Sequence, residues 1–97
     1  MRVNESAKEF EWDKGNIGKN KKHDVEDKEA EESFFDEYKV IYKDAIHSKK
    51  EKRYMLLGKT KRKRLLYIVF TQRKNKIRII SARNINKKEV YLYEKKA

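Results

Sequence analysis

The stretch from Arg64 to Arg83, RLLYIVFTQRKNKIRIISAR, consists of two apolar, β-branched runs joined by the short polar segment Lys74-Asn75-Lys76. Two runs of this length and composition, parted by a tight polar turn, are typical of adjacent antiparallel strands. The stretch therefore predicts a β-hairpin, and it predicts that the fold is built on a sheet.

A two-residue loop at Lys74 and Asn75 fixes the register of this hairpin. The predicted pairs are Arg73 with Lys76, Thr71 with Arg78, and Val69 with Ile80. Because side chains alternate between the two faces of a strand, one face is apolar and the other carries cations. The predicted core face consists of Leu66, Ile68, Phe70, Ile77 and Ile79. The predicted cationic face consists of Tyr67, Thr71, Arg73, Lys76 and Arg78.

One face of any antiparallel sheet can be solvated and charged, so a ligand has to be argued from the rest of the chain. Residues 1–37 hold 7 Lys and Arg against 12 Asp and Glu, a net charge of −5, whereas residues 38–97 hold 20 against 4, a net of +16. Such asymmetry favours a nucleic-acid surface on the basic part, because cations that release phosphate counterions supply most non-specific affinity. A membrane surface or an acidic protein partner is the alternative, although basic membrane binders usually gather charge on an amphipathic helix.

Length and composition narrow the class of protein. The 97 residues are expected to form one domain, 1–97, with a frayed polar segment at residues 1–8. The chain has no cysteine, which excludes disulfides and thiolate metal sites. It has no apolar run long enough to span a membrane, so a cytoplasmic location is expected. Its two histidines, His23 and His47, lack a carboxylate at ligand spacing, so neither a metal nor a cofactor is expected.

The remaining pattern predicts an α+β protein with an antiparallel sheet of four or five strands, two N-terminal helices and one C-terminal helix. Asp13 is a plausible N-cap for a weak first helix at 14–22, and acidic residues crowd the first turn of a second helix at 25–35. The closing helix is expected at 87–95, started by Asn86. The strands are expected at 9–12, 38–42, 53–59, 64–73 and 76–82.

Several segments, taken in order and spacing, resemble the BrnT toxin family of bacterial type II toxin–antitoxin systems over roughly residues 9–94. They are FEWD at 10–13, GN and KN at 15–16 and 19–20, KH at 22–23, EAEESFFD at 29–36, HS at 47–48, RYMLLGKT at 53–60, RLLYIVFTQR at 64–73, KIRIISAR at 76–83 and NKKEVYLYE at 86–94. Two departures concern the first helix. Asp24 stands where the family usually has a glycine, and the stretch between Asn20 and His23 is one residue short.

The resemblance implies a RelE-like fold and a metal-independent endoribonuclease that cleaves RNA and inhibits translation and growth. It also implies neutralisation by a BrnA-type antitoxin, expected to be a ribbon-helix-helix DNA-binding protein, in a 2:2 heterotetramer. Two alternatives stay open. The first is a non-catalytic basic module that binds RNA or DNA with the same face. The second is a chain that has lost activity because its first helix is one residue short, and whose basic surface chiefly binds an antitoxin.

RNA cleavage without a metal needs a base for the ribose 2′-OH, cations for the charge on the phosphorane, and an acid for the departing 5′-oxygen. Histidine is the side chain that ordinarily titrates near neutrality, so His23 and His47 are candidates, with Glu51 as a rival base. Arg73, Arg78 and Arg83 suit phosphate oxygens, although the predicted register points Arg83 away from Arg78 unless the strand bulges. The predicted catalytic residues are His23, Glu51, Arg73, Arg78 and Arg83. The predicted RNA contacts are Lys22, Arg53, Arg64, Tyr67, Thr71 and Lys76.

Overall fold

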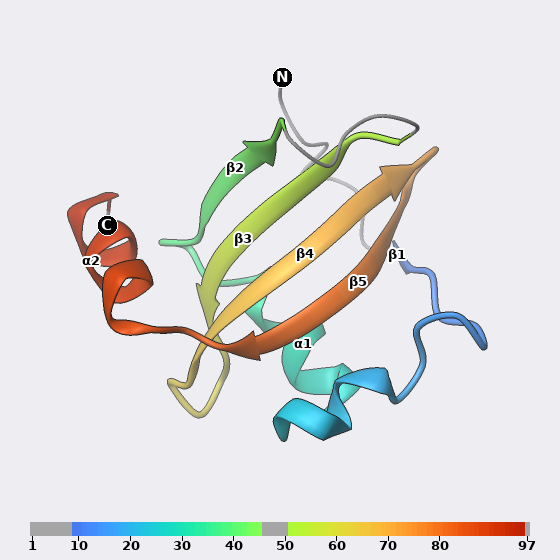
Figure 1. The fold of residues 1–97 in the computed structure, drawn as a ribbon, viewed down its shortest axis with the longest axis horizontal. Coiled ribbons are helices and arrows are strands. Elements are labelled where there is room, and N and C mark those ends of the chain that lie inside the picture. The colour runs from blue at the N-terminus through green and yellow to red at the C-terminus, as the bar shows by residue number, and fades with distance from the viewer. Residues whose placement is uncertain (1–8, 46–50, 97) are drawn as a thin grey trace.

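A five-stranded mixed sheet is the centre of the structure, a computed structural model that describes residues 9–45 and 51–96 (Figure 1). Along the sheet the strands lie in the order β1-β5-β4-β3-β2. Their bounds are β1 Glu9–Phe10, β2 Val40–Asp44, β3 Arg53–Lys59, β4 Leu65–Arg73 and β5 Lys76–Asn84. The helical elements are the 3₁₀ helix η1 Lys19–His23 and the α-helices α1 Asp27–Ser33 and α2 Lys87–Lys96. The α+β class and the number of strands are confirmed.

The expectation of a purely antiparallel sheet is wrong, because β1 runs parallel to β5, with Phe10 beside Ile77. The Phe10 ring packs edge-on against Phe34, with ring centroids 5.3 Å apart. Burial of this ring against the core holds the short strand at the edge of the sheet. Alternation in the sequence could reveal the strand but not its direction.

The hairpin of β4 and β5 has the predicted register near its turn, where Arg73 pairs with Lys76 and Thr71 with Arg78. Lys74 adopts a positive φ of 55°, as a tight two-residue hairpin loop requires. The predicted pair of Val69 with Ile80 is wrong, since a β-bulge makes Ser81 the partner of Val69.

The predicted first helix at 14–22 is also wrong, because the chain there forms turns and then η1. Asp13 does not cap a helix; its Oδ1 accepts a hydrogen bond from the Gly15 amide at 2.7 Å, which closes a local turn. Two buried amides tie the segment to β5 instead. Asn16 Nδ2 donates to the Ile79 carbonyl at 3.0 Å, and the Ala82 amide donates to Asn20 Oδ1 at 2.9 Å. The described residues therefore contain two α-helices rather than three.

The main core lies between the sheet and α1, which is behind the sheet in Figure 1. α1 begins with a capping box in which Glu26 and Glu29 satisfy each other's backbone amides. The core residues are Val25, Ala30, Phe34, Tyr54, Leu56, Leu66, Ile68, Phe70, Ile77, Ile79 and Ala82. The predicted core face of the hairpin is thus confirmed. Phe35, which follows the end of α1 at Ser33, is 65% exposed.

The opposite face of the sheet carries a second, smaller apolar cluster at one corner, where α2 packs beside β2 and β3 (Figure 1). The predicted start of α2 is confirmed, since Asn86 Oδ1 accepts a bond from the Glu89 amide at 2.9 Å. Tyr93 is buried against Val40 and Leu57 and donates to Asp36 Oδ2 at 2.6 Å. Within the described part of the chain, no helix covers the end of this face near the β4–β5 turn. None of the described helices is long and apolar enough to cross a membrane.

Candidate functional site

The two arginines Arg73 and Arg78 lie together on the sheet face opposite α1, called here the hairpin face. Arg73 ends β4, and Arg78 follows the turn on β5, opposite Thr71. The Glu11 carboxylate joins them: its Oε1 accepts from Arg73 Nη1 at 3.1 Å and from Arg78 Nη1 at 3.0 Å. A single carboxylate oxygen therefore bridges two guanidinium groups.

Two further carboxylates complete the group. Glu51 accepts from both Nε and Nη2 of Arg73, the second at 3.1 Å, and Asp13 accepts from Nη1 and Nη2 of Arg78, each at 2.9 Å. Hydrogen bonding to Arg73 lowers the pKa of Glu51, and hydrogen bonding to Arg78 lowers that of Asp13. These five residues, Glu11, Asp13, Glu51, Arg73 and Arg78, are the arginine–carboxylate cluster.

The two arginines differ in accessibility. The Arg73 side chain is 47% exposed, whereas that of Arg78 is 14% exposed. Gly15 permits the close approach of Arg78, because a Cβ at this glycine would lie 2.5 Å from Nη2. Arg73 is therefore the more accessible of the two guanidinium groups, and Arg78 is covered by the segment after β1.

The chemistry of the cluster follows from its charge and its donors. Two guanidinium ions and three ionised carboxylates carry a net charge of −1. Each guanidinium has five N–H donors, of which three are used within the cluster, so two on each side chain have no acceptor among the described residues. Such donors suit phosphate oxygens, while the carboxylates suit proton transfer.

Arg83, predicted to act with Arg73 and Arg78, lies on the same face but outside the cluster. The bulge turns it towards this face, where it pairs with Tyr67, four residues along β4 from the partner of Arg78. At a rise of about 3.3 Å per residue this separation is roughly 13 Å. Its guanidinium stacks on the Tyr67 ring, 4.0 Å from the centroid, and pairs with Glu89 of α2 at 2.7 Å. The bond to Glu89 raises the pKa of Arg83.

The histidine and lysine predicted for the site lie on another element. His23 and Lys22 are exposed at the end of η1, which packs near Ala82 rather than beside Arg73. Arg64 anchors the start of β4: it pairs with Glu29 of α1 at 3.1 Å. His47 lies outside the described residues.

Four other predicted RNA contacts share the hairpin face with the cluster. Lys76 is exposed and its Nζ lies 3.9 Å from Glu9. Arg53 begins β3 opposite Thr71, and its charge contributes to the lowered pKa of Glu51. Thr71 is only 1% exposed and donates to the Lys52 carbonyl, so its hydroxyl has a structural partner. Tyr67 is partly buried beneath Arg83, and burial raises its pKa.

Glu11 and Asp13 were not predicted from the sequence as partners of the two arginines. The signal was present in the alternation of FEWD: with Phe10 in the core, Glu11 must face the other way. The alternation does not show which strand lies next to β1, and only the parallel pairing with β5 brings Glu11 beside Arg78. Trp12, the next residue, packs against the core, and its Nε1 donates to Glu31 at 2.6 Å.

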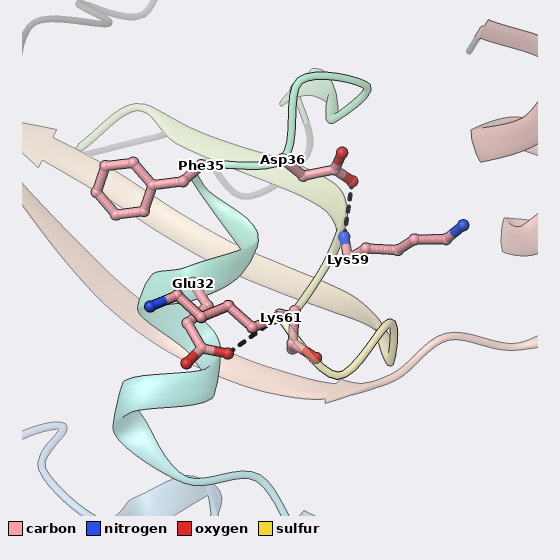
Figure 2. Close-up of a pocket in the computed structure, with 6 residues that line it drawn as sticks. Glu32, Phe35, Asp36, Lys59 and Lys61 are labelled. Carbon is pink, nitrogen blue, oxygen red and sulfur yellow. Dashed lines mark hydrogen bonds between the residues drawn. The ribbon is translucent and has the colours of Figure 1, made fainter.

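A pocket of about 460 Å³ lies elsewhere, between α1 and the turn that joins β3 to β4 (Figure 2). Its carboxylates are already engaged, since Asp36 accepts from the Lys59 amide at 2.8 Å and Glu32 from the Lys61 amide at 3.1 Å. In residues 9–45 and 51–96 no group of three His, Asp or Glu side chains is placed to hold a metal ion.

The fold and the cluster define a small basic α+β protein whose sheet presents paired arginines and carboxylates on one face. Residues 12–89 match the family described as the ribonuclease toxin, BrnT, of type II toxin–antitoxin systems. The match spans most of the chain, which therefore belongs to the BrnT family, as its resemblance in sequence predicted. This family implies an antitoxin as partner. A search of curated proteins finds no significant match.

Proposed function

We propose that this chain is an endoribonuclease toxin that cleaves RNA without a metal ion and thereby inhibits translation and growth. The arginine–carboxylate cluster carries the proposal, since Arg73, Arg78 and Glu51 converge on one accessible face. Family membership supplies the class of activity, ribonuclease, and the cluster supplies groups suited to it.

In this mechanism the unused N–H donors of Arg73 and Arg78 bind the nonbridging oxygens of the scissile phosphate. They also stabilise the charge that develops on the phosphorane. A carboxylate takes the 2′-OH proton, the 2′-oxygen attacks phosphorus, and the bond to the 5′-oxygen breaks. Glu51 is one candidate base from the cluster. His23 is another candidate base. Because it lies on η1, the RNA strand would have to contact both η1 and the cluster.

The flanking cations extend the contact along the strand. Lys76 and Arg53 border the cluster on the hairpin face, and Arg83 with Tyr67 offers a second position for phosphate or base. Arg64, Lys22 and Thr71 remain predicted contacts, although Arg64 and Thr71 already have partners within the protein.

The partner and setting follow the family resemblance. We propose a BrnA-type antitoxin of the ribbon-helix-helix class, a 2:2 heterotetramer, a RelE-like fold within one domain, and action in the cytoplasm. The net charge of +11 supports association with an acidic segment and with RNA.

A non-catalytic RNA- or DNA-binding module is the second candidate. The observation in its favour is that the carboxylates of the cluster outnumber its arginines, so the free protein neutralises its own cations there. Binding would then rest on the surrounding lysines and arginines.

One assay separates the two functions. The purified protein is incubated in EDTA with a labelled single-stranded RNA and with the same strand carrying 2′-deoxyribose. A metal-free ribonuclease cleaves only the ribose strand, because the 2′-oxygen is its nucleophile. Tight, salt-sensitive binding of both strands without cleavage would instead identify the binding module.

A further inference from the structure

Glu11 differs from the other two carboxylates of the cluster in how its oxygens are used. Both oxygens of Glu51 bind Arg73, and both oxygens of Asp13 bind Arg78. Glu11 binds the two guanidiniums through Oε1 alone. Its Oε2 accepts no hydrogen bond from the described residues, so it is the carboxylate oxygen of the cluster that is available to accept a proton.

The backbone of Glu11 is held at both its amide and its carbonyl. Its amide donates to the Ile77 carbonyl at 2.8 Å, and its carbonyl accepts from the buried Asn16 side chain at 2.9 Å. Its side chain is 29% exposed, between the exposed Arg73 and the largely buried Arg78. A phosphate bound by the free donors of both arginines would therefore lie beside this carboxylate.

We infer that Glu11 is the general base of the reaction, with Oε1 fixed between Arg73 and Arg78 and Oε2 receiving the proton of the ribose 2′-OH. This inference rests on the proposed ribonuclease function and assigns the base to Glu11 in place of Glu51. As the 2′-oxygen forms its bond to phosphorus, the bond from phosphorus to the 5′-oxygen breaks. The products are a 2′,3′-cyclic phosphate and a 5′-hydroxyl. The leaving oxygen takes a proton from water, and Glu11 returns its proton to solvent.

Glu11→Gln is the variant that isolates this role. The amide oxygen can still accept from both guanidiniums in place of Oε1, whereas the amide nitrogen that replaces Oε2 is a donor and cannot accept a proton. Glu9→Gln is the matched control, because it makes the same change of charge two residues earlier, on a side chain outside the cluster.

The measurements are single-turnover cleavage of a ribose strand, affinity for the 2′-deoxy strand over a range of salt, and the thermal midpoint. For E11Q we expect turnover about 100-fold or more below wild type, the usual scale for loss of a general base. Affinity for the deoxy strand should equal or exceed that of wild type, because the cluster has lost one negative charge. The thermal midpoint should equal that of wild type. E9Q should cleave at the wild-type rate.

Three results would overturn the inference. In the first, E11Q cleaves within threefold of wild type while Glu51→Gln is inactive, so Glu51 is the base. In the second, E11Q cleaves faster, so Glu11 only masks the arginines. In the third, turnover, affinity and thermal midpoint fall together, so Glu11 is structural. A wild-type protein that cleaves neither alone nor with ribosomes would overturn the proposed function itself, a result distinct from these three.

Discussion

Val69 of β4 pairs with Ser81 of β5, while the next pair towards the turn is Phe70 with Ile79, so β5 contains one residue more than β4 across this step. The extra residue reverses the alternation beyond the bulge. Ala82 consequently enters the core, where it is 0% exposed, and Arg83 reaches the face that carries Arg78. The bulge therefore determines that Arg83 lies on the face of the sheet where it contacts Glu89 of α2.

Deleting Ser81 should be tolerated, because Ile80 then pairs with Val69 in a regular ladder and Ala82 and Arg83 keep their faces. We expect the free energy of unfolding to change by no more than about 2 kcal/mol. Deleting Ser81 and Ala82 together instead moves Arg83 into the core opposite Ile68, because the bulge holds only one extra residue. This should cost at least about 3 kcal/mol for an unpaired buried charge. Urea unfolding of the two variants measures the contrast, and equal losses would mean that the bulge does not set the alternation.

Asn16 holds the segment after β1 against the sheet, so removing its side chain should destabilise the protein strongly. Its buried side chain donates to the carbonyls of Glu11 and Ile79 and accepts from the Asp13 amide. We expect Asn16→Ala to lower the free energy of unfolding by about 2 to 4 kcal/mol, because these backbone groups lose their partners. Ile17→Ala is the control, since Ile17 is 57% exposed, and it should stay within about 0.5 kcal/mol of wild type. Comparable midpoints in urea for the two variants would contradict this account.

Arg73→Ala should separate chemistry from binding. Its side chain is half exposed, so little stability depends on it, but the proposed transition state loses one of its two cations. We expect turnover of bound RNA to fall about 100-fold or more, with a smaller loss of affinity for the 2′-deoxy strand. The control is Arg62→Ala, which removes an exposed cation from the turn beside α1. If affinity alone falls for Arg73→Ala and its salt dependence becomes shallower, the arginine serves binding.

Some of the fold could be predicted because its cause is local. The strand predicted at 53–59 has those bounds in the structure, and the hairpin turn at Lys74 follows from the two apolar runs on either side. The segment at 14–22 could not be predicted, because its conformation depends on amides of Asn16 and Asn20 that bond to β5, more than 60 residues away. Sequence periodicity does not contain such partners.

The same distinction applies to the candidate site. Arg73 and Arg78 could be placed on one face because the turn fixes the register, and the structure has both there. Arg83 could not, because nothing in the alternation of 76–83 marks the bulge. Glu11 required the parallel pairing of β1 with β5, a contact between distant parts of the chain. Arg73 and Arg78 were thus predictable from the local pattern, whereas the position of Glu11 depended on tertiary structure.

The pair of Glu89 with Arg83 should make part of the stability acid-sensitive. Burial of Glu89 raises its pKa, but this is outweighed by hydrogen bonds from Arg83 and from the Asn86 amide and by the charge of Arg83, so the net pKa lies below its ordinary value of 4.5. A carboxyl whose pKa is lowered by folding stabilises the protein above the unfolded value, and this stabilisation is lost as the pH falls from there through the folded pKa. Glu89→Gln removes this contribution.

We therefore expect Glu89→Gln to be less stable than wild type by about 1 to 3 kcal/mol at pH 7, because charge-assisted bonds to a largely buried side chain are lost. The difference should persist down to about pH 5 and shrink as the pH falls below 4.5. Urea unfolding of both proteins from pH 7 to pH 3 measures this difference.

Asp13, Asp36 and Glu51 also have lowered pKa values, but they titrate in both proteins and cancel in the difference. Glu94→Gln, an exposed change on the same helix, should match wild type at pH 7. A difference between Glu89→Gln and wild type that stays constant to pH 3 would show that the ion pair does not lower the pKa of Glu89.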